Sequence, residues 1–563
     1  MSSIRVGSGR LRIVGSVAVA WFLAWAPAAS APPVADLVPV RSSARVQAIA
    51  SLAGTASVPP PCLTPLVQSI RFERQRGTNA TRRALALLAN DPGLPGERVA
   101  VDVDGNAARY TTDRNAFDRI EASDENANGR PDAVDEALAG VARAGRLLVG
   151  QLDLPAPGSV EIVLGRLGSN VDGLTLPFNG KQSRTHIWLD PAVRGGTSMV
   201  RRSVEHQYAH AVAAAAGLDP AWGEAFAVWA TLTIEGSPDD RTLSFLTGRL
   251  ASQGAGLVVD DLELASGNAA WFAFLNESYG PTAVKLAVEE LGRGGSDQAA
   301  LDRAMRRATG DSIEAALRDY QVWSILVGPR DDGKHFSFAA RLPAPVFAAS
   351  AEALPALSIQ SDPEVGPMGQ AAVSLRSTEP TGGLTVRFEG DPAARWAADL
   401  LLVRNDGALH RVPLALDADD AGALTVPLQD VREVLLLARN LDPEGRPARR
   451  YSWAAHFEPG FPAEFGTLHV ESAGPKGGAL VSWETSAEQG LLGFNVLRAR
   501  SGGEASRVNP VWIPSMGGTS GPASYSFFDA SADPAVAYRY FVEAVTLEGL
   551  KSQSEDVALA PAP

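Results

Sequence analysis

Cysteine is nearly absent from this chain, since Cys62 is the single copy among 563 residues. One thiol excludes an internal disulfide framework and any cysteine-rich zinc or iron–sulfur site. A metal ion would therefore have to be held by histidine and carboxylate ligands. Positive charge is also scarce, because 50 Lys and Arg face 64 Asp and Glu, for a net charge of −14. That balance opposes non-specific binding to nucleic acid or to an anionic membrane.

Long apolar runs are missing beyond the N-terminal region. Residues 1–31 contain three arginines, then an apolar run that ends in small residues, which is typical of a signal peptide. The run is short for a bilayer span. We therefore expect a cleaved signal peptide, an exported chain that is periplasmic or secreted outside the cell, and no membrane span after cleavage. Small-residue sites ending at Ala28 and Ala31 are both compatible with cleavage.

Composition and the pattern of apolar residues divide the mature chain into four regions. Residues 32–96 are rich in Ala and Pro and have the character of a leader or propeptide-like segment. Residues 97–330 place strand patterns before long helical patterns, which predicts an α+β domain. Short apolar runs broken by Gly, Pro and Asp then predict two β-sandwiches, over 340–460 and 462–560. The predicted fold class is multidomain, and the strand spacing of the last region is that of a fibronectin-type-III-like module.

A helical pattern over residues 199–216 carries the most informative side chains. His206 and His210 are four residues apart, so both imidazoles can point to one ion from the same helical face. A glycine ends this helix, and an Asp-Pro pair starts a second one that carries Glu224. A tight turn would fold Glu224 back toward the histidines and leave a fourth metal position for water. The alternative is two histidines on an amphipathic helix, satisfied by neighbours or solvent.

Five short segments follow one another in a recognisable order. They are Tyr-Thr-Thr at 110–112, an Asp/Asn-rich loop at 124–135, His-Ile-Trp-Leu-Asp at 186–190, His-Gln-Tyr-Ala-His at 206–210, and Trp-Gly-Glu-Ala-Phe-Ala-Val-Trp at 222–229. The series spans a little over a third of the chain and resembles a family of exported bacterial zinc metalloproteases, zincins of the gluzincin type. The resemblance implies a zincin-like domain over 97–330 and zinc ligands His206, His210 and Glu224. It also implies a peptide or protein substrate along an edge strand at 185–189, which carries His186.

Gln207 departs from the family pattern, which has the general-base glutamate directly after the first histidine. An amide cannot accept the proton of a metal-bound water. Glu205 lies about 140° around the helix from His210, so it is badly placed to substitute. Loss of a general base commonly costs about 10²- to 10⁴-fold in rate. We therefore expect a zinc-binding protein with weak or no peptidase activity; the alternative is an extracellular adhesion or binding protein that uses this domain as a scaffold.

Tyr279 is the remaining candidate for a group that stabilises a developing oxyanion. No histidine lies between His210 and His335 to take that role. The alternative for Tyr279 is an aromatic ring packed at a helix end.

Residues 124–135 have the spacing of a calcium-binding loop. Oxygen-bearing side chains stand at positions 1, 3, 5, 9 and 12, glycine stands at position 6, and position 7 would offer its backbone carbonyl. The implied calcium ligands are Asp124, Asn126, Asn128, Arg130, Asp132 and Asp135. The loop ends in Asp rather than Glu, which predicts weaker binding. The alternative is an Asx-rich turn before a helix that begins near Asp132.

Overall fold

The structure is a computed structural model, and it describes most of the chain beyond residue 92. The described residues are 62–65, 93–167, 171–176, 184–190, 197–259, 261–358, 364–379, 382–458, 463–474, 477–488, 490–500, 505–516, 523–547 and 549–561. The chain divides into two units, Met1–Ser42 and Ser43–Pro563, and every described residue belongs to the second. The predicted signal peptide and most of the predicted leader lie outside the described residues.

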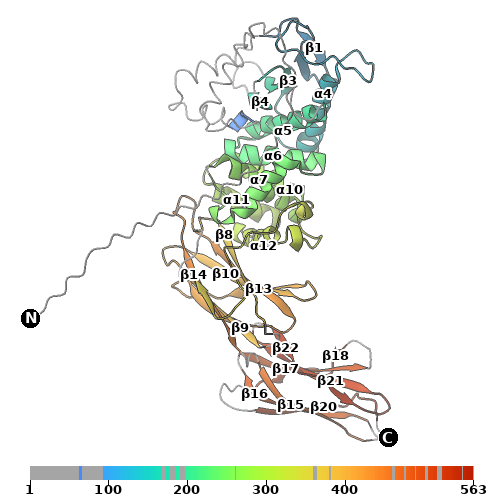
Figure 1. The fold of residues 1–563 in the computed structure, drawn as a ribbon, viewed down its shortest axis with the longest axis vertical. Coiled ribbons are helices and arrows are strands. Elements are labelled where there is room, and N and C mark those ends of the chain that lie inside the picture. The colour runs from blue at the N-terminus through green and yellow to red at the C-terminus, as the bar shows by residue number, and fades with distance from the viewer. Residues whose placement is uncertain are drawn as a thin grey trace, which may run out of the picture. The chain divides into compact units, whose positions relative to one another are not determined.

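A five-stranded sheet begins the mixed α and β part of the chain (Figure 1). Its order is β1-β2-β3-β5-β4, with bounds Arg98–Val101, Ala107–Tyr110, Ser159–Leu164, Arg184–Leu189 and Gly173–Leu176. Strand β5, predicted as the edge, pairs with β3 on one side and with β4 on the other. The edge-strand prediction for 185–189 is therefore wrong. The four residues of β4 are too few to show a strand pattern, yet they are all buried and extend the sheet by one strand.

Helices fill most of the segment from residue 132 to residue 325. They are α4 (Asp132–Gly145), η1 (Arg146–Gln151), α5 (Thr197–Ala216), α6 (Pro220–Glu235), α7 (Asp240–Ala251), η2 (Gln253–Ala255), α8 (Leu262–Gly267), α9 (Ala269–Tyr279), α10 (Pro281–Gly292), α11 (Asp297–Thr309) and α12 (Ile313–Ile325). One apolar core joins them to the sheet, with Ile187, Trp229 and Phe272 fully buried. Within the described part of the chain, no helix has the length and apolar character needed to cross a bilayer.

The turn between α5 and α6 is fixed by local chemistry, as predicted. Gly217 has φ +85° and lies so close to α10 that an added Cβ would stand 2.7 Å from the carbonyl oxygen of Gly292. The Asp219 carboxylate then accepts hydrogen bonds from the backbone N–H groups of Ala221 and Trp222, which caps α6. This pair of stop and start signals makes α5 and α6 neighbours and positions the site described below.

Short 3-10 turns, η3 (Gly328–Arg330) and η4 (Ala339–Arg341), lead into a β region with two sheets. The first sheet has order β11-β10-β13-β8-β6 and the second β12-β9-β14-β7, and side chains of both sheets share one core. The strands are β6 (Ala349–Ala351), β7 (Ala356–Ser358), β8 (Gln370–Leu375), β9 (Gly383–Gly390), β10 (Trp396–Arg404), β11 (Leu409–Leu414), β12 (Ala421–Pro427), β13 (Val431–Asn440) and β14 (Tyr451–Glu458). Two sheets that share one core form a β-sandwich arrangement.

The last β region also has two sheets around its own core, which contains Trp483, Phe494 and Tyr540. Its strands are β15 (Ala463–Ser472), β16 (Ala479–Glu488), β17 (Leu491–Arg500), β18 (Ser506–Arg507), β19 (Ile513–Pro514), β20 (Ala523–Asp529), β21 (Tyr538–Thr546), β22 (Lys551–Gln553) and β23 (Val557–Leu559). The predicted fold class therefore holds at the level of mixed α and β followed by β-sandwiches. The fibronectin-type-III likeness stays a prediction.

Candidate metal centre

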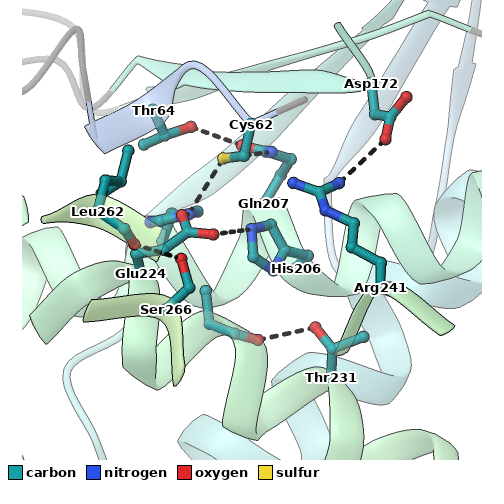
Figure 2. Close-up of polar contacts among 12 residues, drawn as sticks. Cys62, Thr64, Asp172, His206, Gln207, Glu224, Thr231, Arg241, Leu262 and Ser266 are labelled. Atoms are coloured by element: carbon teal, nitrogen blue, oxygen red, sulfur yellow. Dashed lines mark hydrogen bonds and ion pairs between the residues drawn. The ribbon is translucent and has the colours of Figure 1, made fainter. Parts of the chain in front are cut away.

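Helices α5 and α6 bring together the three side chains that the sequence predicts as ligands. Nε2 of His210 lies 2.9 Å from one carboxylate oxygen of Glu224, and Nε2 of His206 lies 3.6 Å from the other. The two imidazole rings meet edge to face, with centroids 4.8 Å apart. Figure 2 shows the carboxylate of Glu224 turned toward the imidazole of His206. The helix, turn and helix therefore fold Glu224 back onto the histidines.

A fourth donor comes from residue 62, far upstream in the chain. Sγ of Cys62 lies 3.3 Å from Nε2 of His210, and the ligand atoms of Cys62, His206, His210 and Glu224 all lie within 4.8 Å of one another. The expectation of histidine and carboxylate ligands alone did not include this thiol, which lies among the converging donors. A single thiol cannot build a cysteine-rich site, but it can complete a mixed one. The available signal was an unpaired cysteine in a chain expected to be exported.

The four donors are suited to a divalent cation. Metal–ligand bonds of about 2.0–2.3 Å in tetrahedral geometry separate neighbouring ligand atoms by roughly 3.3–3.8 Å. The donor atoms found here are 2.9, 3.3 and 3.6 Å apart in three pairs, and no pair is more than 4.8 Å apart. Nε2 of His206 is buried and has no hydrogen-bond partner among the described residues. A thiolate and a carboxylate also balance a charge of two, with both imidazoles neutral. The buried group could therefore hold a metal ion.

Opposite charges dominate the electrostatics of the group. Burial raises the pKa of Glu224, but the neighbouring imidazoles of His206 and His210 outweigh that effect and hold its pKa well below the usual value. Burial lowers the pKa of His210, but Cys62 and Glu224 outweigh it and raise that pKa. The carboxylate thus favours its ionised form and the site attracts positive charge. A metal ion could supply that charge in place of protons.

Both the oxygen and the nitrogen of the Gln207 side-chain amide form hydrogen bonds. Its Oε1 accepts a hydrogen bond of 2.8 Å from the hydroxyl of Thr64 and lies 2.7 Å from the hydroxyl of Thr175. Its Nε2 donates to Sγ of Cys62 across 3.2 Å (Figure 2). The side chain is 2% exposed. Gln207 therefore contacts the thiol and the 62–65 segment, and it offers no base to a water.

Glu205 lies away from the group, as its position on the helix predicts. Its carboxylate is fully buried and lies 3.1 Å from a guanidinium nitrogen of Arg143 on α4. Burial, and then the nearby carboxylate of Glu235, raise the pKa of Glu205 to about 8. It is a member of a buried charge cluster and does not replace the missing base.

The other two candidate residues are not part of the group. His186 is buried on β5, where it stands between Glu161 of β3 and Leu176 of β4 in the strand register. Tyr279 ends α9, and its ring packs edge-on against Phe274 with centroids 5.5 Å apart. Neither is among the four converging side chains or among the residues that line the adjacent cavity. Tyr279 therefore fits the packed-aromatic alternative.

A cavity of about 120 Å³ adjoins the metal group and is lined in part by Cys62, His206 and Gln207. Two arginines of its wall are already paired, Arg241 with Asp172 at 3.2 Å and Arg202 with Asp239 at 2.9 Å. This volume is enough for several waters.

The loop at 124–135 is closed by its own hydrogen bonds. Asp124 accepts from the backbone N–H groups of Asn128 and Gly129. Asp135 accepts from the amides of Asn126 and Asn128, and its second oxygen lies 3.0 Å from Arg130. Helix α4 begins at Asp132, as the Asx-turn alternative requires. The loop carboxylates are not among the converging metal-binding groups of the described residues.

No protein-family model and no curated protein sequence matches the chain. Among solved structures, it is similar to a β-1,2-glucanase from Parabacteroides distasonis, with 13% identity, 35% of this chain and 31% of that chain covered, and a TM-score of 0.13. A GH2 β-galacturonidase from Eisenbergiella tayi bound to galacturonate has 16% identity, coverage of 34% and 35%, and a TM-score of 0.13. The match thus spans about a third of each of these proteins. TM-scores this low carry no argument about fold or function.

Proposed function

We propose that this chain is an exported zinc-binding protein related to zinc metallopeptidases, with weak or no peptidase activity. The observation that carries the proposal is the convergence of His206, His210 and Glu224 from two adjacent helices onto one buried point. Two imidazoles and a carboxylate are a donor set that catalytic zinc sites use. With zinc bound, such a site would supply a polarised water; the protein residues would position that water and accept its proton.

The residue that should accept the proton is the one this chain lacks. Gln207 is an amide, and its two polar atoms are already bonded to Thr64, Thr175 and Cys62. Glu205 is fully buried beside Arg143. Any hydrolysis would therefore proceed without a general base at this position.

A second function fits the same observation. If the site only stabilises the fold, the α and β part is a scaffold and the chain is an extracellular adhesion or binding protein. The specific support is that the amide of Gln207 serves packing rather than chemistry, beside two β-sandwich regions suited to act as spacers or adhesion units. Bound zinc with no activity in any repaired variant would favour this function.

The test is the zinc content and peptidase activity of the mature chain. We expect about one zinc per chain in the wild type, and a large loss in Glu224→Ala and His206→Ala, because each removes one ligand. His469→Ala is the matched control, since that histidine is 63% exposed and contacts Glu471 alone in the described hydrogen bonds. Elemental analysis after dialysis gives the stoichiometry. Zinc absent from the folded wild type would contradict the proposal.

Calcium in the loop at 124–135 stays a separate prediction. We expect millimolar calcium to raise the melting temperature, and Asp124→Ala to remove that rise, because the ion would replace the hydrogen bonds that Asp124 now accepts. Asp113→Ala, on an exposed loop outside the predicted ligands, is the control. An equal response to calcium in wild type and Asp124→Ala would leave the loop as an Asx turn.

A further inference from the structure

Residues 62–65 occupy the free edge of the sheet. The backbone N–H of Leu63 donates to the carbonyl oxygen of Gly173 on β4, and Cys62 forms a parallel bridge with the same glycine. The hydroxyl of Thr64 accepts a hydrogen bond of 2.8 Å from the N–H of Thr175. Cys62, Leu63 and Thr64 are all buried. The chain's own upstream segment thus covers the edge beside the metal group.

Gln207 links this segment to the metal group. An added Cβ on Gly173 would stand 2.9 Å from Nε2 of Gln207, so β4 leaves just enough room for the amide. The Oε1 atom of Gln207 accepts hydrogen bonds from the hydroxyl groups of Thr64 and Thr175, and its Nε2 donates one to the sulfur of Cys62. A glutamate here would have no N–H to donate, and its charge would repel both a thiolate and Glu224. The amide can therefore donate to the sulfur of Cys62, which a glutamate could not do.

We propose that Cys62 is the fourth protein ligand of the metal, so that the centre is closed and residues 62–65 seal it. This inference rests on the proposed zinc site. When the ion binds, the thiol proton passes to solvent and a sulfur–metal bond forms, giving a neutral set of one dication, one thiolate, one carboxylate and two neutral imidazoles. Structural zinc sites have four protein ligands, whereas catalytic ones keep a position for water. A coordination position for water appears only when the sulfur of Cys62 is absent from the metal.

The test uses the mature full-length chain loaded with cobalt(II), whose absorption spectrum reports its ligands. We expect one cobalt per chain and an intense thiolate-to-cobalt charge-transfer band in the near ultraviolet. Cys62→Ser is expected to keep the cobalt and lose this band, because a hydroxyl replaces the sulfur. Gln207→Leu should keep the band but move its wavelength, since the sulfur loses a hydrogen bond. His469→Ala is the control and should retain the wild-type spectrum.

A thiol reagent gives a second reading, since Cys62 is the single cysteine of the chain. We expect its reaction to be at least about tenfold slower in the metal-loaded protein than after chelation, because a coordinated thiolate is shielded. This measurement uses the wild-type protein, so it tests whether Cys62 binds the metal even if Cys62→Ser fails to fold.

Each contradictory result would overturn a different part of the proposal. Bound cobalt without the charge-transfer band, or equal thiol reactivity with and without metal, overturns the role of Cys62 and leaves a three-ligand zinc site. A band that does not move in Gln207→Leu overturns the contact between the amide and the coordinated sulfur. No bound cobalt in either wild type or Cys62→Ser overturns the proposed function itself.

Discussion

His210→Ala is expected to abolish the stabilisation that zinc gives to the protein. His210 is fully buried and touches both Cys62 and Glu224, so its loss removes the central ligand of the group. A metal present at about a thousand times its dissociation constant stabilises the folded state by about 4 kcal/mol. In a domain of this size, that corresponds to roughly 8–16 °C in melting temperature. We expect this zinc-dependent rise in the wild type and almost none in His210→Ala.

The measurement is the difference in melting temperature with and without zinc, made on each protein. This difference matters because alanine also leaves a cavity that lowers the stability of the metal-free form. His469→Ala, an exposed histidine, should show the full wild-type rise. An equal zinc-dependent rise in His210→Ala and wild type would show that the metal binds elsewhere.

The double variant Cys62→Ala/Gln207→Glu is expected to gain peptidase activity. Removal of the thiol opens a coordination position, and Nε2 of Gln207 now lies 3.2 Å from the atom that would be replaced by water. A carboxylate at that place is within hydrogen-bonding distance of the water and can take its proton. We expect the double variant to exceed Cys62→Ala by about 10²- to 10⁴-fold, the usual contribution of a general base. Gln207→Glu alone should stay near the wild-type rate, because sulfur still fills the position.

An internally quenched peptide mixture measures these rates for wild type, the two single variants and the double variant. Adding Glu224→Gln to the double variant is the control, and it should remove the activity together with the zinc. Equal rates for Gln207→Glu and the double variant would mean that the thiol blocks nothing. Equal rates for Cys62→Ala and the double variant, with zinc bound in both, would favour the scaffold function.

The local part of the site was predictable because its contacts are short in sequence. His206 and His210 share a helical face through their spacing, and Asp219 with Pro220 starts the next helix, which places Glu224 within reach. The same periodicity argument placed Glu205 on the other flank, where it is found beside Arg143. Each of these predictions depends on helix geometry over fewer than 20 residues.

The sheet was predicted less well, and the reason is again physical. The strand at 185–189 has a clear apolar pattern, but pattern alone does not determine which strands flank it. The short β4, with four buried residues, takes the edge instead. The contact of this edge with residues 62–65 depends on that order.

The sequence alone determined the two helices, the turn between them and the three side chains that they bring together, because capping and helical periodicity are written in adjacent residues. Only the tertiary structure decided that Cys62 joins them and that Gln207 contacts its sulfur. Cys62 and His210 are 148 positions apart, and no local propensity specifies a contact of that separation. It forms because the order of the strands leaves one edge free beside α5, where a buried segment can satisfy its backbone hydrogen bonds.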